Sequence, residues 1–172
     1  MSLVIVDTGC ANISSVYCAF QRLGVDAKVS RDLSVIKNAS RLLVPGVGAA
    51  RQAMANLRER DLIATLQQAE QPLLGICLGM QLLTDRSEEG DVDCLGLIPG
   101  QVKRMQVGDL RLPHMGWNTL QVEESAQNHP LLKGIGEKDY VYFVHSFAVA
   151  PSDTTLALSL IHISEPTRQE AI

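Results

Sequence analysis

Features common to several other classes of protein are missing from these 172 residues. The chain has no run of 18 apolar residues, which argues against a membrane-spanning helix. Its first residues lack the basic, apolar and small-residue order of a signal peptide. The net charge of −4 gives no reason to expect nucleic acid or an anionic membrane surface as a partner. We therefore expect a cytoplasmic protein that binds neither nucleic acid nor membrane.

Paired cysteines are also missing. The four cysteines are scattered along the chain, with no Cys-x-x-Cys motif, at Cys10, Cys18, Cys77 and Cys94. This spacing argues against both a disulfide framework and a zinc site. We accordingly expect free thiols in a reducing compartment, and no metal.

Apolar runs alternate with amphipathic stretches through the first half of the chain, which is 46% hydrophobic and 20% charged overall. This alternation predicts an α/β fold, namely a doubly wound, mostly parallel sheet with flanking helices and with ligands at the carboxyl ends of its strands. The expected strands cover residues 3–6, 27–29, 41–44 and 72–76, and the expected helices include residues 12–24, 32–38 and 78–83.

The pattern changes after residue 84. Short strand-like pieces over residues 96–105, 110–113 and 118–122 predict antiparallel strands at one edge of the sheet, and residues 139–144 predict a further, buried strand. No internal repeat, low-complexity segment or second boundary is visible, so we expect one domain over residues 1–157. The remaining residues, 158–172, closely resemble the translated read-through of a sequencing-library adapter, which predicts a non-native tail.

Cys77 lies between two glycines, in Gly-Ile-Cys-Leu-Gly over residues 75–79, where an expected strand passes into an expected helix. This is the spacing of a nucleophile elbow, with cysteine in place of serine. Side chains two residues from the nucleophile would collide with neighbouring backbone at such a turn, and glycine removes them. The pattern favours a catalytic Cys77, and the alternative is a buried cysteine in an ordinary turn.

A cysteine nucleophile also needs hydrogen-bond donors for the oxyanion and a base. The candidate donors are the backbone N–H of Leu78 and one from the Pro-Gly-Val-Gly loop at residues 45–48. The sequence does not single out the base. His129 lies in a polar stretch before Pro130, and His162 lies in the expected tail. His114 lies in a cluster that fits either a binding loop or a packed turn. His145 ends an expected strand and fits either a site residue or a structural histidine.

Two other interpretations stay open at this point. Residues 4–11, Val-Ile-Val-Asp-Thr-Gly-Cys-Ala, resemble the active-site signature of aspartic proteases, but those enzymes are β-rich, whereas Asp7 leads into an amphipathic helix. The other interpretation is a non-catalytic α/β interaction domain in which Cys77 is structural.

Five stretches together resemble the class I glutamine amidotransferases. Two belong to the class as a whole: Pro-Gly-x-Gly at residues 45–48 and Gly-Ile-Cys-Leu-Gly-Met-Gln at residues 75–81. Three are typical of one branch, the glutaminase subunits of imidazole glycerol phosphate synthase: residues 7–12, 113–118 and 142–147. The resemblance runs to about residue 151 and implies a flavodoxin-like α/β fold with no cofactor. Another class I amidotransferase subunit is the alternative.

The resemblance implies that Cys77 attacks the side-chain amide of glutamine, releasing ammonia and leaving a thioester that water hydrolyses to glutamate. Gly48 and Leu78 would form the oxyanion hole, with a peptide flip at residues 46–47 coupling activity to the partner's ligand. The residues that would hold glutamine are Gly46, Gln81 and the backbone of Ser146 and Phe147.

The resemblance also implies a partner. Ammonia would pass, shielded from solvent, to a (β/α)₈-barrel cyclase subunit in a heterodimer. That subunit would make imidazole glycerol phosphate and an aminoimidazole carboxamide ribotide, in histidine biosynthesis. A loop over residues 113–118 would face the cyclase through His114, Trp117 and Asn118.

One part of the family pattern is not found. Relatives carry the histidine and glutamate of the catalytic triad in a late Phe-His-Pro-Glu stretch, and these 172 residues contain none. Ile-His-Ile-Ser-Glu at residues 161–165 has the wrong spacing and context. We therefore expect the base and its acid to be absent from this chain, together with the C-terminal part of the domain, and the chain itself to be inactive.

Overall fold

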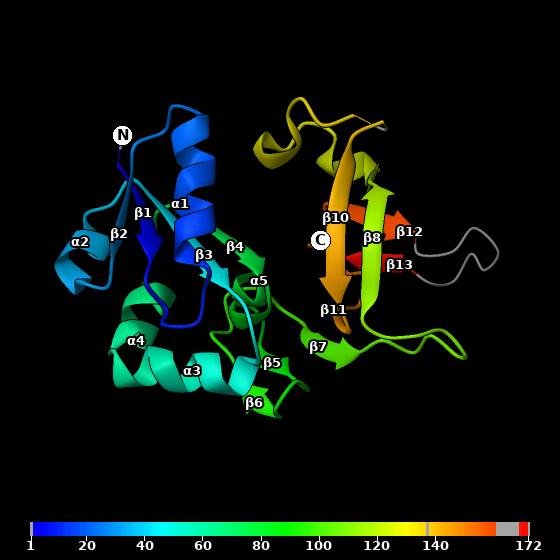
Figure 1. Cartoon of the computed structure of the whole chain (residues 1–172), viewed down its shortest axis with the longest axis horizontal. Coiled ribbons are helices and arrows are strands. Elements are labelled where there is room, and N and C mark those ends of the chain that lie inside the picture. The colour runs from blue at the N-terminus through cyan, green and yellow to red at the C-terminus, as the bar shows by residue number, and fades with distance from the viewer. Residues whose placement is uncertain (1, 137, 161–168, 172) are drawn as a thin grey trace. The chain divides into compact units, whose positions relative to one another are not determined.

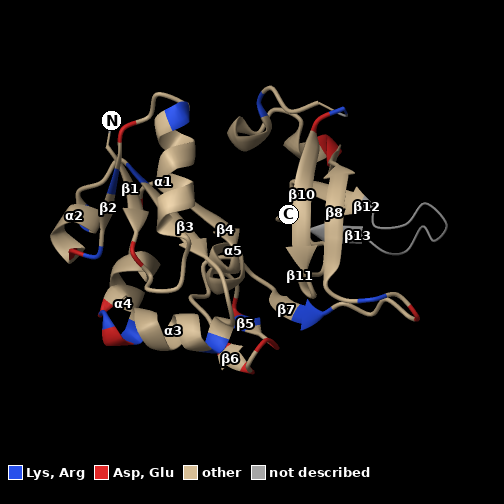
Figure 2. Ribbon diagram, viewed as in Figure 1, with Lys and Arg blue, Asp and Glu red and all other residues tan. Residues whose placement is uncertain are grey.

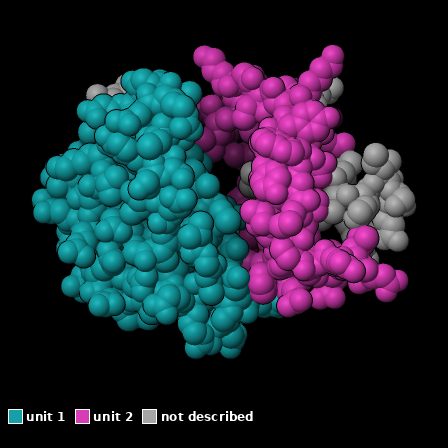
Figure 3. Space-filling view, viewed as in Figure 1, with its two compact units in different colours: residues 1–99 teal, residues 100–172 magenta. Residues whose placement is uncertain are grey.

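The structure is a computed structural model that describes residues 2–136, 138–160 and 169–171. The chain divides into two compact units, residues 1–99 and 100–172 (Figure 3). The single domain expected over residues 1–157 stays a prediction. So does the non-native tail, of which residues 161–168 and 172 lie outside the described part of the chain.

The first unit is built on a parallel sheet of four strands in the order β2-β1-β3-β4 (Figure 1). The register places the strands' carboxyl ends at one edge, so that Gly46 lies opposite Cys77. The strands are β1 (Leu3–Val6), β2 (Ala27–Ser30), β3 (Arg41–Gly46) and β4 (Leu73–Cys77). The helices are α1 (Ile13–Arg22), α2 (Leu33–Lys37), α3 (Ala50–Glu59), α4 (Leu62–Gln67) and α5 (Leu78–Leu83). A short antiparallel pair follows, β5 (Arg86–Ser87) and β6 (Val92–Asp93).

Both faces of this sheet are covered, because successive residues of a strand point to opposite faces. Ile5 and Leu43 face α1 and pack with Val16, Tyr17 and Phe20. The alternate positions of the same strands pack against α2, α3, α4 and α5 in a larger cluster that includes Val4, Val6, Leu42, Val44, Ile36, Leu57, Leu66 and Leu82. The predicted doubly wound α/β architecture is confirmed.

Local signals explain where the helices of this unit begin. Asn12 accepts a hydrogen bond from the N–H of Ser15 at the start of α1, as the sequence predicts. Asp32 does the same for α2, accepting from the N–H groups of Ser34 and Val35. These bonds, with that from the Ser34 hydroxyl, lower the pKa of the Asp32 carboxyl.

The second unit is made of antiparallel pairs. β7 (Gln101–Arg104) pairs with β11 (Phe147–Val149), and β8 (His114–Thr119) pairs with β10 (Tyr140–His145). β12 (Ala157–Leu160) pairs with both β9 (Gln121–Val122) and β13 (Gln169–Ala171). Two single-turn 3₁₀ helices, η1 (Glu124–Ala126) and η2 (Pro130–Leu132), lie between β9 and β10.

Three sequence predictions need correction in these strands. Residues 110–113 are not a strand, because the N–H of Leu110 closes a turn onto Val107. Residues 114–118, expected in a loop, form most of β8, whose pairing with β10 comes from more than twenty residues along the chain. β10 is not fully buried, because only one of its faces is covered, and Tyr140, Tyr142 and Val144 are exposed on the other.

Candidate functional site

Cys77 occupies a strained turn between a strand and a helix. It is the last residue of β4 and the N-cap of α5, with φ 55° and ψ −118°. A positive φ is uncommon for a residue other than glycine, and such strain collects at functional sites. The side chain is exposed. The predicted elbow conformation is therefore present, and it presents the thiol to solvent at the carboxyl edge of the sheet.

Glycines make room for this turn. A Cβ on Gly79 would lie 1.8 Å from the carbonyl oxygen of Val44, and one on Gly75 would lie 2.7 Å from the backbone of Met80. A Cβ on Gly46 would lie 2.8 Å from the backbone nitrogen of Gly79. Each contact is with backbone rather than with the end of a side chain, so no rotamer change relieves it. The steric reason given by the sequence for the glycines around Cys77 is confirmed.

β4 departs from the expectation of a buried strand. Leu74 and Ile76 are 37% and 40% exposed. The reason is the strand order, because β4 is the last strand of the parallel sheet over the described residues. An apolar run identifies a strand but does not place it within its sheet.

The expected oxyanion donors lie on two segments next to Cys77. Leu78 is the first residue of α5, where backbone N–H groups have no partner within the helix. Gly48 has φ 99°, and a Cβ there would meet nothing within 4 Å, so the position needs glycine for its backbone angle rather than for space. The assignment of Gly48 and Leu78 to the oxyanion hole stays a prediction.

Gln81 lies one turn into α5 and is buried, with its Oε1 accepting a hydrogen bond of 3.5 Å from the hydroxyl of Ser87. Glu89, two residues after Ser87, was not identified from the sequence as a residue of interest. Its carboxylate accepts a hydrogen bond from the N–H of Ala50 at the start of α3, and its Oε2 is buried without a partner. The N-cap of α3, Ala49, makes no side-chain cap, so Glu89 supplies this function from another segment.

Burial raises the pKa of Glu89 above its ordinary value of 4.5, against the opposing effect of the Ala50 hydrogen bond. Folding thus disfavours the ionised form of Glu89. The stability contributed by its neutral carboxyl group is present at low pH and is lost as pH rises through the raised pKa. We expect Glu89→Gln, which stays neutral and can still accept from Ala50, to raise the urea midpoint at pH 7 and to change it little at pH 4. A lower midpoint at pH 7 would contradict this.

The other expected site residues belong to the second unit. Ser146 is the one residue between β10 and β11, and its carbonyl accepts a hydrogen bond from the N–H of Met105. His145 places Nδ1 2.8 Å from the carbonyl oxygen of Phe147, which holds the bend at Ser146. His114 lies across from His145 with a ring separation of 5.9 Å, and its Nε2 is buried without a partner.

The structure thus brings Gly46, Gly48, Cys77, Leu78 and Gln81 together in the first unit, and Ser146 and Phe147 with His114 in the second. Trp117 and Asn118 lie on β8 with His114. His129 is a local cap whose Nδ1 accepts from the N–H of Leu131, and His162 lies outside the described residues. The unit that carries Cys77 contains no histidine at all.

Among the described residues, no group of three or more side chains is arranged to hold a metal ion, and no helix has the length and apolar character to cross a bilayer. All four cysteines are free thiols. Burial, with the nearby charge of Asp93, raises the pKa of Cys94 to about 11.

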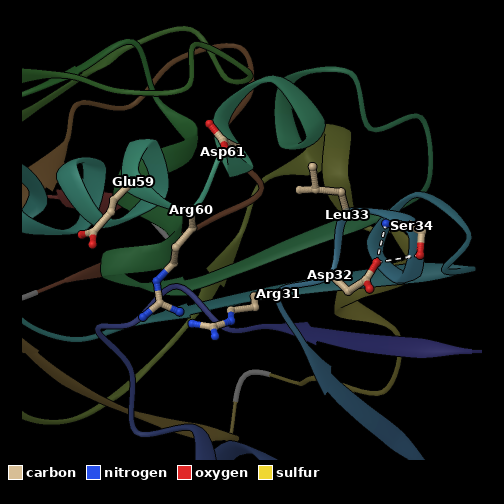
Figure 4. Close-up of a pocket in the computed structure, with 7 residues that line it drawn as sticks. All are labelled: Arg31, Asp32, Leu33, Ser34, Glu59, Arg60 and Asp61. Carbon is tan, nitrogen blue, oxygen red and sulfur yellow. Dashed lines mark hydrogen bonds between the residues drawn. The ribbon is translucent and has the colours of Figure 1, made fainter.

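A pocket of about 870 Å³ opens elsewhere on the first unit, between the start of α2 and the end of α3 (Figure 4).

Comparisons with known proteins agree on one family. The sequence model of the family described as glutamine amidotransferase class-I matches residues 4–172. The imidazole glycerol phosphate synthase subunit HisH of Vibrio cholerae is 56% identical over 162 residues, covering 91% of this chain and 78% of that protein. The subunit of the same name from Haemophilus influenzae is 51% identical over 159 residues, covering 92% of this chain and 78% of the relative. A crystal structure described as a glutamine amidotransferase has a TM-score of 0.68 at 20% identity, covering 91% of this chain and 84% of that one, which concerns the fold alone.

Proposed function

Because the chain belongs to the class I glutamine amidotransferase family, we propose that it is the glutaminase subunit of an imidazole glycerol phosphate synthase, acting in histidine biosynthesis. The observation that carries the proposal is the exposed Cys77 on a strained turn that three glycines make possible. An aspartic protease is excluded, because Asp7 lies in the loop between β1, a strand of a parallel α/β sheet, and α1.

The proposed reaction is acyl transfer through cysteine. The sulfur of Cys77 bonds to the carbonyl carbon of the glutamine side-chain amide, and the oxygen takes up negative charge. The carbon–nitrogen bond then breaks, and the nitrogen accepts a proton and leaves as ammonia. Water attacks the resulting thioester, which releases glutamate and returns the thiol. Backbone N–H groups of Leu78 and of the loop at residues 45–48 would stabilise the oxyanion, as their positions beside Cys77 favour.

Substrate positioning is proposed for Gly46, Gln81, Ser146 and Phe147. Gln81 is one turn of helix from Cys77, and its fixed contact with Ser87 limits its rotamers. Ser146 lies at a chain bend that His145 holds, which suits a backbone that must present its polar groups to a small zwitterion.

Protection of a thiol tests this site without requiring turnover. Cys77 and Cys18 are both exposed, so iodoacetamide should alkylate both, and each rate can be followed by mass spectrometry of peptides. We expect L-glutamine to slow alkylation of Cys77 and to leave Cys18 unchanged, because bound substrate covers only Cys77. Equal rates at Cys77 with and without L-glutamine, or the same protection by D-glutamine, would argue against the proposal.

The partner would be a (β/α)₈-barrel cyclase subunit, in a cytoplasmic heterodimer whose second reaction is that of a lyase. One face of the second unit supports a protein partner. β8 and β10 contain no Lys, Arg, Asp or Glu (Figure 2), and Trp117 is 67% exposed. Its ring lies 5.3 Å from that of Tyr142, which is also exposed, and Met115, Tyr140 and Val144 extend this face. Exposed aromatic groups of this kind are typical of the centres of protein interfaces.

Trp117→Ala should therefore raise the dissociation constant for the cyclase subunit by about 30-fold, the effect of losing a central aromatic contact. Isothermal titration calorimetry with the cyclase of the same organism measures this constant. Leu23→Ala is the matched control, because Leu23 is a 75% exposed apolar residue of the first unit and should change it little. An unchanged constant for Trp117→Ala would remove this face from the interface.

A further inference from the structure

An ion pair between Asp7 and Arg60 holds the loop that follows β1. Arg60, just after α3, places Nη1 3.1 Å from Oδ2 of Asp7 and 3.3 Å from the carbonyl oxygen of Asp7. Figure 4 shows the Arg60 side chain directed away from the carboxylate of Asp61, its neighbour in sequence. The two side chains are 25% and 31% exposed, so this pair is partly removed from solvent.

The loop closes tightly on this ion pair. The N–H of Gly9 donates to Oδ1 of Asp7 at 3.0 Å, so the two carboxylate oxygens serve different partners. Gly9 has φ 76°, and a Cβ there would lie 2.5 Å from Nη2 of Arg60. The absence of a side chain at Gly9 is therefore what lets the guanidinium group lie against the backbone of the loop.

The same loop holds the segment beside Cys77. The carbonyl oxygen of Cys10 accepts a hydrogen bond of 2.8 Å from the N–H of Val47. Thr8 is fully buried, and its hydroxyl donates to the carbonyl oxygen of Pro45 at 3.4 Å. The peptide between Gly46 and Val47 cannot turn its N–H in another direction without breaking the bond to Cys10.

We propose that Arg60 is a positioning residue for the loop at residues 45–48, acting through Asp7 and the carbonyl of Cys10. Arg60 fixes Asp7 and Gly9, the loop fixes the Cys10 carbonyl, and that carbonyl fixes the orientation of the Val47 N–H. The proposal rests on the proposed function for its relevance to the oxyanion hole, but the contacts that carry it do not depend on the reaction.

Hydrogen exchange at one amide tests the connection directly. Arg60→Gln removes the charge and keeps a polar side chain, and we expect the Val47 amide, followed by NMR, to exchange about two- to fivefold faster, the range for a partly exposed ion pair. The amide of Leu43, in the core of β3, should not change, which separates local release from general destabilisation. Arg58→Gln is the matched control, because it removes the same charge from an exposed residue of α3, two positions before Arg60.

Asp7→Asn provides the second variant, because its amide oxygen can still accept from Gly9 while the ion pair is lost. It should raise exchange at Val47 as Arg60→Gln does, and the double variant should add nothing further. Unchanged exchange at Val47 in both variants would overturn the proposal, as would an equal increase at Leu43. Protection of Cys77 by glutamine is a separate measurement, so a failure of the proposed function would be recognised independently.

Discussion

Glutamine turnover by the 172-residue chain, with its cyclase partner present, should be about 10²- to 10⁴-fold slower than by a chain that ends in the family's own C-terminal segment. The comparison chain replaces residues 158–172 with the C-terminal part of the Vibrio cholerae relative, of which this chain covers 78%. The physical reason is the base that Cys77 needs and that we expect this chain to lack. The first unit contains no histidine, and the 172 residues contain no Phe-His-Pro-Glu stretch, so Cys77 would lack the group that takes its proton and supplies one to ammonia.

Ammonia release measured by a coupled dehydrogenase assay gives both rates. Cys77→Ser in the replaced chain is the control, and it should bring turnover down to the background of the assay. Equal turnover by the two chains would mean that a base lies among the present residues, and His114 and His145 would then be the first to substitute.

Gly79→Ala should lower the free energy of unfolding by about 3 kcal/mol or more, the upper end of the cost of overpacking. A Cβ at this position would lie 1.8 Å from the carbonyl oxygen of Val44, and the contact is with the backbone of a central strand. Relief would require β3 and α5 to separate, which would open the core around Leu78 and Leu82. Urea denaturation followed by circular dichroism measures the change.

Gly116→Ala is the control for this substitution. Gly116 lies in β8 with no positive φ, and a Cβ there would meet nothing within 4 Å. We expect no loss of stability from it, since alanine is favoured over glycine within a strand by about 0.5–1 kcal/mol. A stability loss of similar size in both variants would show that the close approach at Gly79 is not the cause.

The sequence was most informative where local rules decide the structure. Apolar runs marked β1 and β3, Asn12 marked the start of α1, and the glycines at positions 75 and 79 marked a turn that backbone crowding then explains. Each of these depends on neighbours within a few residues, which a sequence pattern contains.

Long-range contacts decided the parts that the sequence did not reveal. Residues 114–118 contain Gly116 and Trp117 and resemble a loop, yet pairing with β10 makes them a strand. Glu89 has no pattern of its own, and its contact with Ala50 exists only because the β5–β6 hairpin meets the start of α3. The edge position of β4 follows from strand order, which apolar content does not encode.

The glycines around Cys77 also limit which single substitutions this fold tolerates. Gly46, Gly75 and Gly79 each face backbone atoms, and Gly46 also faces the Cβ of Leu78. Shortening a neighbouring side chain therefore creates no space for a Cβ, and no second-site substitution compensates for the first. In a library that randomises these three codons, selection for a folded elbow should return glycine at all three, while Gly48, constrained by its backbone angle alone, should also admit asparagine.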